Sequence, residues 1–194
     1  MLSSNKITIL SLRHLHLSHK EISVICQVLE SNVGILSLDL HGNVMDAVGA
    51  TSLSQSLSRC HSLRQLDLGG NQEFNNNIGV DGAAALSRAL QSHTSLELLH
   101  LSYNNLSPDG IRELYGLISR SSRLKSLDLE GNVKDVGNRL GQISCLHTWK
   151  LISSCTNLTD LNISENGFLS RGQQSVKKAL SGSNHELHQP AACI

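Results

Sequence analysis

The chain has 194 residues, enough for one compact domain or one short repeat array, and its 16 basic residues are balanced by 16 acidic ones. This neutral balance argues against a nucleic-acid-binding protein, which would carry a strongly basic surface. Aromatic residues make up only 3% of the sequence, so leucine must fill most of the core, and this favours regular, repeated packing.

The cysteines and the N-terminus bear on the cellular compartment. Five cysteines occur without a CxxC pair, so the sequence indicates neither a zinc ribbon nor a thioredoxin-type site. Residues 1–10 lack the basic start and long apolar stretch of a secretory signal peptide, and no apolar run is long enough to span a membrane. An odd number of cysteines fits a reducing compartment. We therefore expect a cytoplasmic protein that requires no cofactor.

From residue 12 onward, one pattern recurs: three apolar residues, with two residues between the first pair and one between the second, then two further residues and an asparagine. The six copies are Leu12, Leu15, Leu17 and Lys20; Ile35, Leu38, Leu40 and Asn43; Leu63, Leu66, Leu68 and Asn71; Leu96, Leu99, Leu101 and Asn104; Leu124, Leu127, Leu129 and Asn132; and Leu158, Leu161, Ile163 and Asn166. An asparagine amide both donates and accepts, so it can satisfy the backbone where a strand ends. Lys20 departs from this rule in the first copy, where an atypical capping unit is expected.

Each copy combines two periodicities. Apolar residues alternate with polar ones at the start, as Leu15 does with His14 and His16, and this predicts a half-buried strand. The second half has helical spacing, as between Leu53 and Leu57. A strand, a helix and a parallel strand bury their apolar faces only against neighbouring units, so stacked repeats must supply the core.

The pattern over residues 12 to about 180 resembles the leucine-rich repeat family, and its length and helical second half resemble the ribonuclease-inhibitor type. Residues 60–71 and 95–118 are also similar to the C-terminal repeats of NOD-like immune receptors. The resemblance implies an α/β solenoid with a parallel sheet on its concave face and helices on its convex face. We predict an N-terminal extension at residues 1–11, six repeats at 12–180 and a C-terminal tail at 181–194. Residues 72–77 and a longer stretch that contains Trp149 enlarge two strand-to-helix connections.

The side chains between the repeated apolar positions should face the concave side. We predict that a partner protein is bound by His16, Asp39, His41, Asp67, His100, Tyr103, Asp128 and Glu130, and by Trp149 on an edge loop. Asp39 and Asp67 would form an acidic strip that receives lysine or arginine from the partner. Two alternatives remain open: the aspartates are solvated fillings of the repeat, and Tyr103 packs on its own loop.

The sequence favours recognition over catalysis. It contains no P-loop, GxSxG or HExxH motif, and the cluster of His14, His16, Asp39 and His41 has no diagnostic metal-ligand spacing. The resemblance implies an innate-immune or regulatory binding module. A Ran-type GTPase-activating protein is the alternative, although residues 181–194 hold only Glu186 where that family has an acidic tail. An unpaired first strand also predicts self-association.

Overall fold

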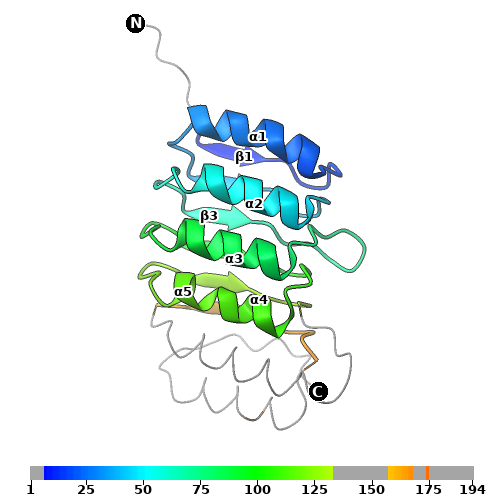
Figure 1. Cartoon of the computed structure of the whole chain (residues 1–194). Helices are drawn as coiled ribbons and strands as arrows, with labels where there is room; N and C mark the ends of the chain where they lie inside the picture. Colours follow the sequence, from blue (N-terminus) through cyan, green and yellow to red (C-terminus); the bar gives the residue numbers. More distant parts are fainter. Residues whose placement is uncertain (1–6, 133–156, 168–173, 175–194) are drawn as a thin grey trace, which may run out of the picture.

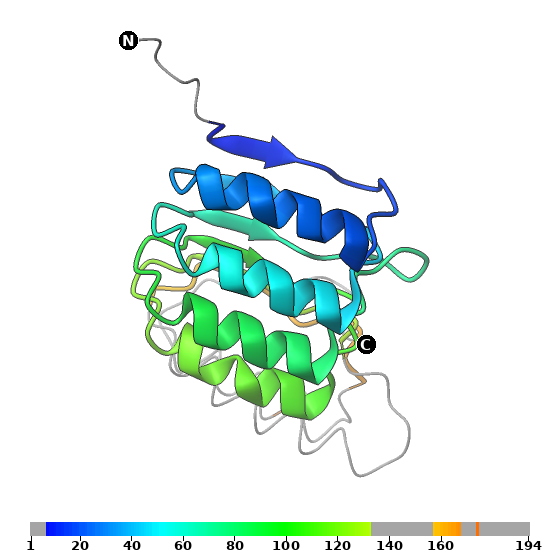
Figure 2. The same cartoon turned by 45° about the horizontal axis from the view of Figure 1, so that its top comes forward.

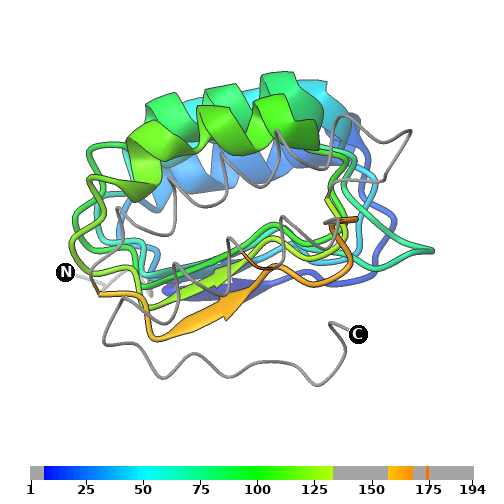
Figure 3. The same cartoon turned by 90° about the horizontal axis from the view of Figure 1, so that it is seen from below.

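The computed structural model describes residues 7–132, 157–167 and 174, and every structural statement below concerns those residues. Six short strands form one parallel sheet in chain order (Figure 1). They are β1 (Ile9–Ser11), β2 (Ser37–Asp39), β3 (Gln65–Asp67), β4 (Leu98–His100), β5 (Ser126–Asp128) and β6 (Asp160–Asn162). The helices are α1 (His19–Ser31), α2 (Asp46–Leu57), α3 (Gly79–Leu90), α4 (Ser107–Glu113) and α5 (Tyr115–Ile118). All of these helices lie on one side of the sheet (Figure 3), as the predicted solenoid requires.

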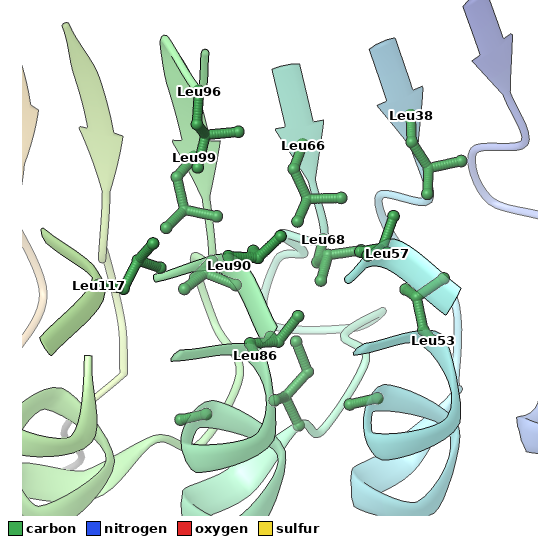
Figure 4. Packing of buried hydrophobic residues seen from close by; sticks show 14 of the residues in the cluster. Leu38, Leu53, Leu57, Leu66, Leu68, Leu86, Leu90, Leu96, Leu99 and Leu117 are labelled. Atoms are coloured by element: carbon green, nitrogen blue, oxygen red, sulfur yellow. The ribbon is translucent and has the colours of Figure 1, made fainter. Parts of the chain in front are cut away.

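The leucine columns make the core continuous from repeat to repeat. Leu38, Leu66, Leu99, Leu127 and Leu161 are paired in register across the sheet. Figure 4 shows the strand leucines directed toward helix residues such as Leu53 and Leu86, which are fully buried. The predicted fold class is confirmed, because the inner leucines pack between the strands and the helices.

The first repeat begins five residues earlier than the sequence pattern indicates. Leu10, rather than Leu15, pairs with Leu38, and Leu15 is 55% exposed. Both registers fit the apolar spacing, but only a start at Ile7 places the first repeat 28 residues before Ile35. The predicted boundary of an extension at residue 11 is therefore wrong, since residues 9–11 already form β1.

The same shift moves Lys20 out of the turn that was expected to contain it. Lys20 lies in the first turn of α1, which begins after a capping box formed by Ser18 and Glu21. Leu15 stands where the other repeats have asparagine, and its backbone N–H donates to the side-chain oxygen of Asn43, 3.1 Å away.

A second correction concerns the third repeat, where Asn76 takes the place that the pattern assigns to Asn71. Asn76 is fully buried, and its amide donates to the carbonyl oxygens of Leu40 and Leu68, both 3.0 Å away. Asn71 is exposed and accepts backbone N–H groups of Glu73 and Phe74. The inserted residues are thus 71–75, and they form a loop that projects from the strand-to-helix edge (Figure 2).

Glycines allow successive helices to approach one another closely. A Cβ on Gly82 of α3 would lie 3.0 Å from the Cβ of Ala50 in α2, and Gly49 and Gly110 face the preceding helix in the same way. The equivalent place in α1 holds Glu21, whose carboxylate caps the helix instead. The face of α1 that is turned away from α2, which we call its outer face, therefore lacks the glycine that α2, α3 and α4 present to the preceding helix.

Two predicted features, Trp149 and the tail at residues 181–194, lie outside the described residues. No helix in the described ranges is both long and apolar enough to cross a membrane.

Candidate binding face

One residue from each strand forms a row across the face of the sheet that is turned away from the helices. The strand register aligns Ser11, Asp39, Asp67, His100, Asp128 and Asn162. We call these six residues the concave row. All except Ser11, which lies on the edge strand β1, are half-buried.

The aspartates of the concave row also have a structural role. One carboxylate oxygen of Asp39, Asp67 and Asp128 accepts the backbone N–H two residues later, at 2.9–3.1 Å. Asn162 makes the same turn with Ser164, so an amide oxygen suffices. This bond explains why "LDL" recurs, yet it occupies only one of the two oxygens. The second oxygen of Asp39 lies near Ser11 and Arg13.

Polar side chains connect the loop after β2 with β3, β4, β5 and β6 along this face. His41 Nδ1 lies 3.4 Å from Asp67 Oδ1, and His100 Nδ1 lies 3.7 Å from Asp67 Oδ2. His100 Nε2 is 3.2 Å from the Ser126 hydroxyl oxygen, which donates to Asp160 at 2.9 Å. The predicted residues His41, Asp67 and His100 are therefore brought together, and Ser126 and Asp160 join them.

The charges of this network perturb one another. Hydrogen bonding to Asp67 raises the pKa of His100 although burial opposes this, and the nearby carboxylates of Asp128 and Asp160 raise it further. Burial would raise the pKa of Asp67, but contacts with His100, the Gly69 N–H and His41 outweigh it and hold that pKa below its usual value. Asp67 and His100 thus stabilise each other's charged forms.

Asp128 is the only aspartate of the concave row without an ion pair among the described residues. Burial raises the pKa of Asp128, and the negative charges of Glu130 and Asp67 raise it further. The hydrogen bond from the Glu130 backbone N–H and the charge of His100 oppose this but do not outweigh it. The part of the concave row at Asp128 is therefore a place where an external cation would be favoured.

Ser126, His100 and Asp67 follow the order of a serine–histidine–aspartate triad, but their geometry does not support nucleophilic catalysis. The Ser126 hydroxyl donates its proton to Asp160 rather than to His100. The oxyanion that forms on a substrate carbonyl attacked by Ser126 would also lie near the carboxylate of Asp160, whereas catalysis requires hydrogen-bond donors around it.

Tyr103 and Glu130 lie at the rim beside the row. The Tyr103 ring packs so tightly on Gly131 that a Cβ there would lie only 2.6 Å from the ring, and its hydroxyl donates to Glu165 at 2.8 Å. Burial and the contact with Glu165 raise the pKa of Tyr103. Glu130 accepts from the Asn162 amide at 3.0 Å. The Tyr103 side chain therefore packs on the following repeats and not on its own loop, which was the alternative to a partner contact.

His16 does not lie on the sheet, and its predicted place in the row is taken by Ser11. Its ring instead contacts Phe74 of the inserted loop at a centroid distance of 5.2 Å, and His14 contacts both Phe74 and His41. The register error in the first repeat caused this misplacement. Among the described residues, no three histidine, cysteine or acidic side chains are arranged to hold a metal ion.

Sequence reasoning also missed Ser126, Asp160 and Glu165. Ser126 and Asp160 occupy the first outward-facing position of their strands, and the strand alternation that placed Asp128 could have identified them. Glu165 is a rim residue whose contact with Tyr103 spans two repeats, which a single repeat's pattern does not reveal.

Comparisons with known proteins agree with this architecture. A family model described as "Leucine Rich repeat" matches residues 59–75, 92–114 and 154–172. The chain is 34% identical over 131 residues to "NACHT, LRR and PYD domains-containing protein 13" of Homo sapiens, a match that covers 64% of this chain and 12% of that protein. It is 29% identical over 160 residues to the ribonuclease inhibitor of Mus musculus, covering 81% of this chain and 32% of that protein.

A solved structure of "Leiomodin-1 Actin-Binding Site 2 (ABS2)" aligns with a TM-score of 0.49 at 16% identity, covering 90% of this chain and 79% of that one. The repeats and the sheet together define a protein of the leucine-rich repeat class, and this chain belongs to it. More narrowly, its repeats are of the ribonuclease-inhibitor-like type, with similarity to those of NOD-like receptors. The chain spans about an eighth to a third of the length of these relatives.

Proposed function

We propose that this chain is a protein-interaction scaffold that binds a partner through the concave face and the edge loops. In this proposal, lysine or arginine side chains of the partner complement the concave row. The observation that carries it is the half-buried carboxylate of Asp128, whose charge is disfavoured by burial and by Glu130 and Asp67, and which has no ion-pair partner among the described residues. A cationic side chain placed there would stabilise the charge that burial disfavours.

The test is affinity capture with the wild-type chain and a variant that carries Asp39→Asn, Asp67→Asn and Asp128→Asn. Asparagine preserves the turn that each aspartate makes with its own backbone, as Asn162 demonstrates, and removes only the charge. We expect the variant to lose a protein that the wild type captures. A matched control carries Glu30→Gln, Asp81→Asn and Asp109→Asn, which remove three exposed charges from the helices. Equal capture by all three proteins would contradict the proposal.

The edge loops supply the second part of the proposed surface. Phe74 is 36% exposed on the inserted loop, beside the rings of His14 and His16. Trp149 belongs to the same proposal on the other enlarged connection. Aromatic side chains contribute strongly to interface energies, so a partner that covers this edge would gain affinity from them.

We further propose a cytoplasmic, non-enzymatic role in innate-immune or other regulatory recognition. The similarity to the repeats of a NACHT, LRR and PYD domains-containing protein supports this role, and the unpaired, buried thiols of Cys26 and Cys60 fit a reducing compartment. The absence of catalysis has its own test: a fluorophosphonate probe should leave Ser126 unlabelled, and rapid labelling at that residue would contradict it.

A further inference from the structure

The histidine at the centre of the binding face lies inside the acidic row rather than beside it. In the strand register, His100 of β4 is flanked by Asp67 of β3 and Asp128 of β5. Its two ring nitrogens are directed to different neighbours, with Nδ1 3.7 Å from Asp67 and Nε2 3.2 Å from the Ser126 hydroxyl. Both nitrogens can donate only in the imidazolium form, so this environment favours protonation.

The charged groups that face His100 come from every neighbouring strand. Asp67 lies on β3, Asp128 on β5 and Asp160 on β6, and each carboxylate favours the protonated ring. His41 of the loop after β2 approaches the same Asp67 from the far side at 3.4 Å. A protonated His100 thus adds one positive charge among three carboxylates, and a neutral His100 leaves the centre of the face more negative by one charge.

We propose that protonation of His100 regulates the binding face, because its imidazolium takes the charge position that a partner's lysine or arginine occupies when the ring is neutral. This inference rests on the proposed function, since it assumes a cationic partner on the concave row. Binding of that partner releases a proton from His100, and affinity rises with pH. A partner that instead presented carboxylates would show the opposite dependence.

The sign follows from the shift in pKa. The carboxylates raise the pKa of His100 in the free protein. A partner cation bound to the same carboxylates offsets their charge and so lowers the pKa of His100. Linkage requires the reciprocal change: the partner's affinity grows as the ring loses its proton, by at most about tenfold per pH unit for one proton.

Calorimetric titration with hexalysine between pH 5.5 and 8, at one low ionic strength, tests this directly. We expect the wild-type affinity for hexalysine to increase by about tenfold across this range. In His100→Gln, the amide can still donate to Asp67 or Ser126 but does not titrate. Its affinity should stay within about twofold from pH 5.5 to pH 8, since no proton is exchanged.

A matched control replaces a histidine that also pairs with aspartate but lies away from the sheet. His19 Nδ1 is 2.9 Å from Asp46 at the start of α1 and α2, so His19→Gln removes an aspartate-paired ring without touching the concave row. This variant should retain the wild-type pH dependence. In an NMR titration, hexalysine should also lower the pKa of the His100 ring in the wild type.

The outcomes separate this inference from the function on which it rests. If His100→Gln binds hexalysine with undiminished pH dependence, or if hexalysine leaves the titration of His100 unchanged, the regulation is overturned while cation binding stands. If the wild type binds hexaglutamate but no hexalysine at any pH, the cationic partner is overturned and the regulation falls with it.

Discussion

At the scale of single residues, buried asparagines join the turns of successive repeats. Asn76 and Asn104 both donate to the carbonyl oxygen of Leu68, so one acceptor is shared by two repeats. The Asn132 side-chain oxygen in turn accepts the backbone N–H of Asn104 at 2.8 Å. Because these amides are buried, each lost hydrogen bond costs more than it would at the surface.

The corrected position of the third asparagine can be tested by mutation. Asn76→Ala removes two donated hydrogen bonds at a fully buried site and should destabilise the fold by about 2–3 kcal/mol. Asn71→Ala loses only an exposed turn and should cost less than about 1 kcal/mol. Urea unfolding of both variants measures the difference. A larger loss for Asn71→Ala would restore the register that the sequence pattern indicates.

His93 is a buried residue that we expect to reduce stability. It is 2% exposed, and neither ring nitrogen has a hydrogen-bond partner within the described structure. Burial lowers its pKa and the neighbouring His61 lowers it further, while the backbone of Ser58 and Leu57 opposes this without reaching hydrogen-bond geometry. His93 therefore stays neutral in the fold when the unfolded chain is already protonated.

Replacing His93 should raise stability most at mildly acidic pH. The pKa of His93 is lower in the fold than in the unfolded chain. Protonation of His93 therefore costs no stability above the unfolded pKa near 6.5, and the free energy of unfolding decreases as pH falls toward the folded pKa. His93→Leu should stabilise the protein by about 1–2 kcal/mol at pH 7.5, and by more at pH 5.5. Denaturant midpoints at the two pH values provide the measurement; a gain that shrinks at pH 5.5 would contradict the argument.

At the scale of elements, helix spacing depends on glycines at one repeated position. A Cβ on Gly82 would approach Ile78 Cγ2 to 2.5 Å and the Cβ of Ala50 to 3.0 Å. A Cβ on Gly116 of α5 would meet only Ser87 Oγ at 3.7 Å, an ordinary contact. The same chemical change should therefore have opposite effects at the two sites.

We expect Gly82→Ala to destabilise the protein by about 1–3 kcal/mol through overpacking between α2 and α3. Gly116→Ala should stabilise it by about 0.5–1 kcal/mol, since alanine loses less backbone entropy in a helix. Thermal melts followed by circular dichroism compare the two. Equal shifts in one direction would show that close helix contact is not what selects glycine at position 82.

At the scale of the whole molecule, the sheet ends at β1 with an open edge among the described residues (Figure 2). Ile9 is 70% exposed there, and Val24 and Val28 are 58% and 37% exposed on the outer face of α1. Helices α2, α3 and α4 have a glycine where they contact the preceding helix, whereas α1 has Glu21 at that position. Another helix stacked on α1 at the same spacing would therefore meet the Glu21 side chain. A second copy that pairs along β1 would cover the edge without that spacing, and we propose this as the route of self-association.

Sedimentation analysis over a range of concentrations tests this proposal. The wild type should show a mass that rises with concentration, whereas a variant with Ile9→Lys and Val24→Lys should remain monomeric, because charges on an edge oppose pairing. Val48→Lys, at a site on α2 that is 62% exposed, provides a control that should associate like the wild type. A wild type that stays monomeric at all concentrations would exclude the edge as an interface.

The sequence alone determined the repeat, the fold class and the concave positions of Asp39, Asp67, His100 and Asp128, because strand alternation and helical spacing are local properties of the chain. Only the tertiary structure decided where the first repeat begins, which asparagine enters the third turn, and that His100 bridges Asp67 and Ser126. In the first two cases, two local solutions fit the pattern equally well, and the third is a contact between side chains of different repeats. The choice between the two solutions depends on hydrogen bonds and packing with the neighbouring repeat, which one repeat's sequence does not contain.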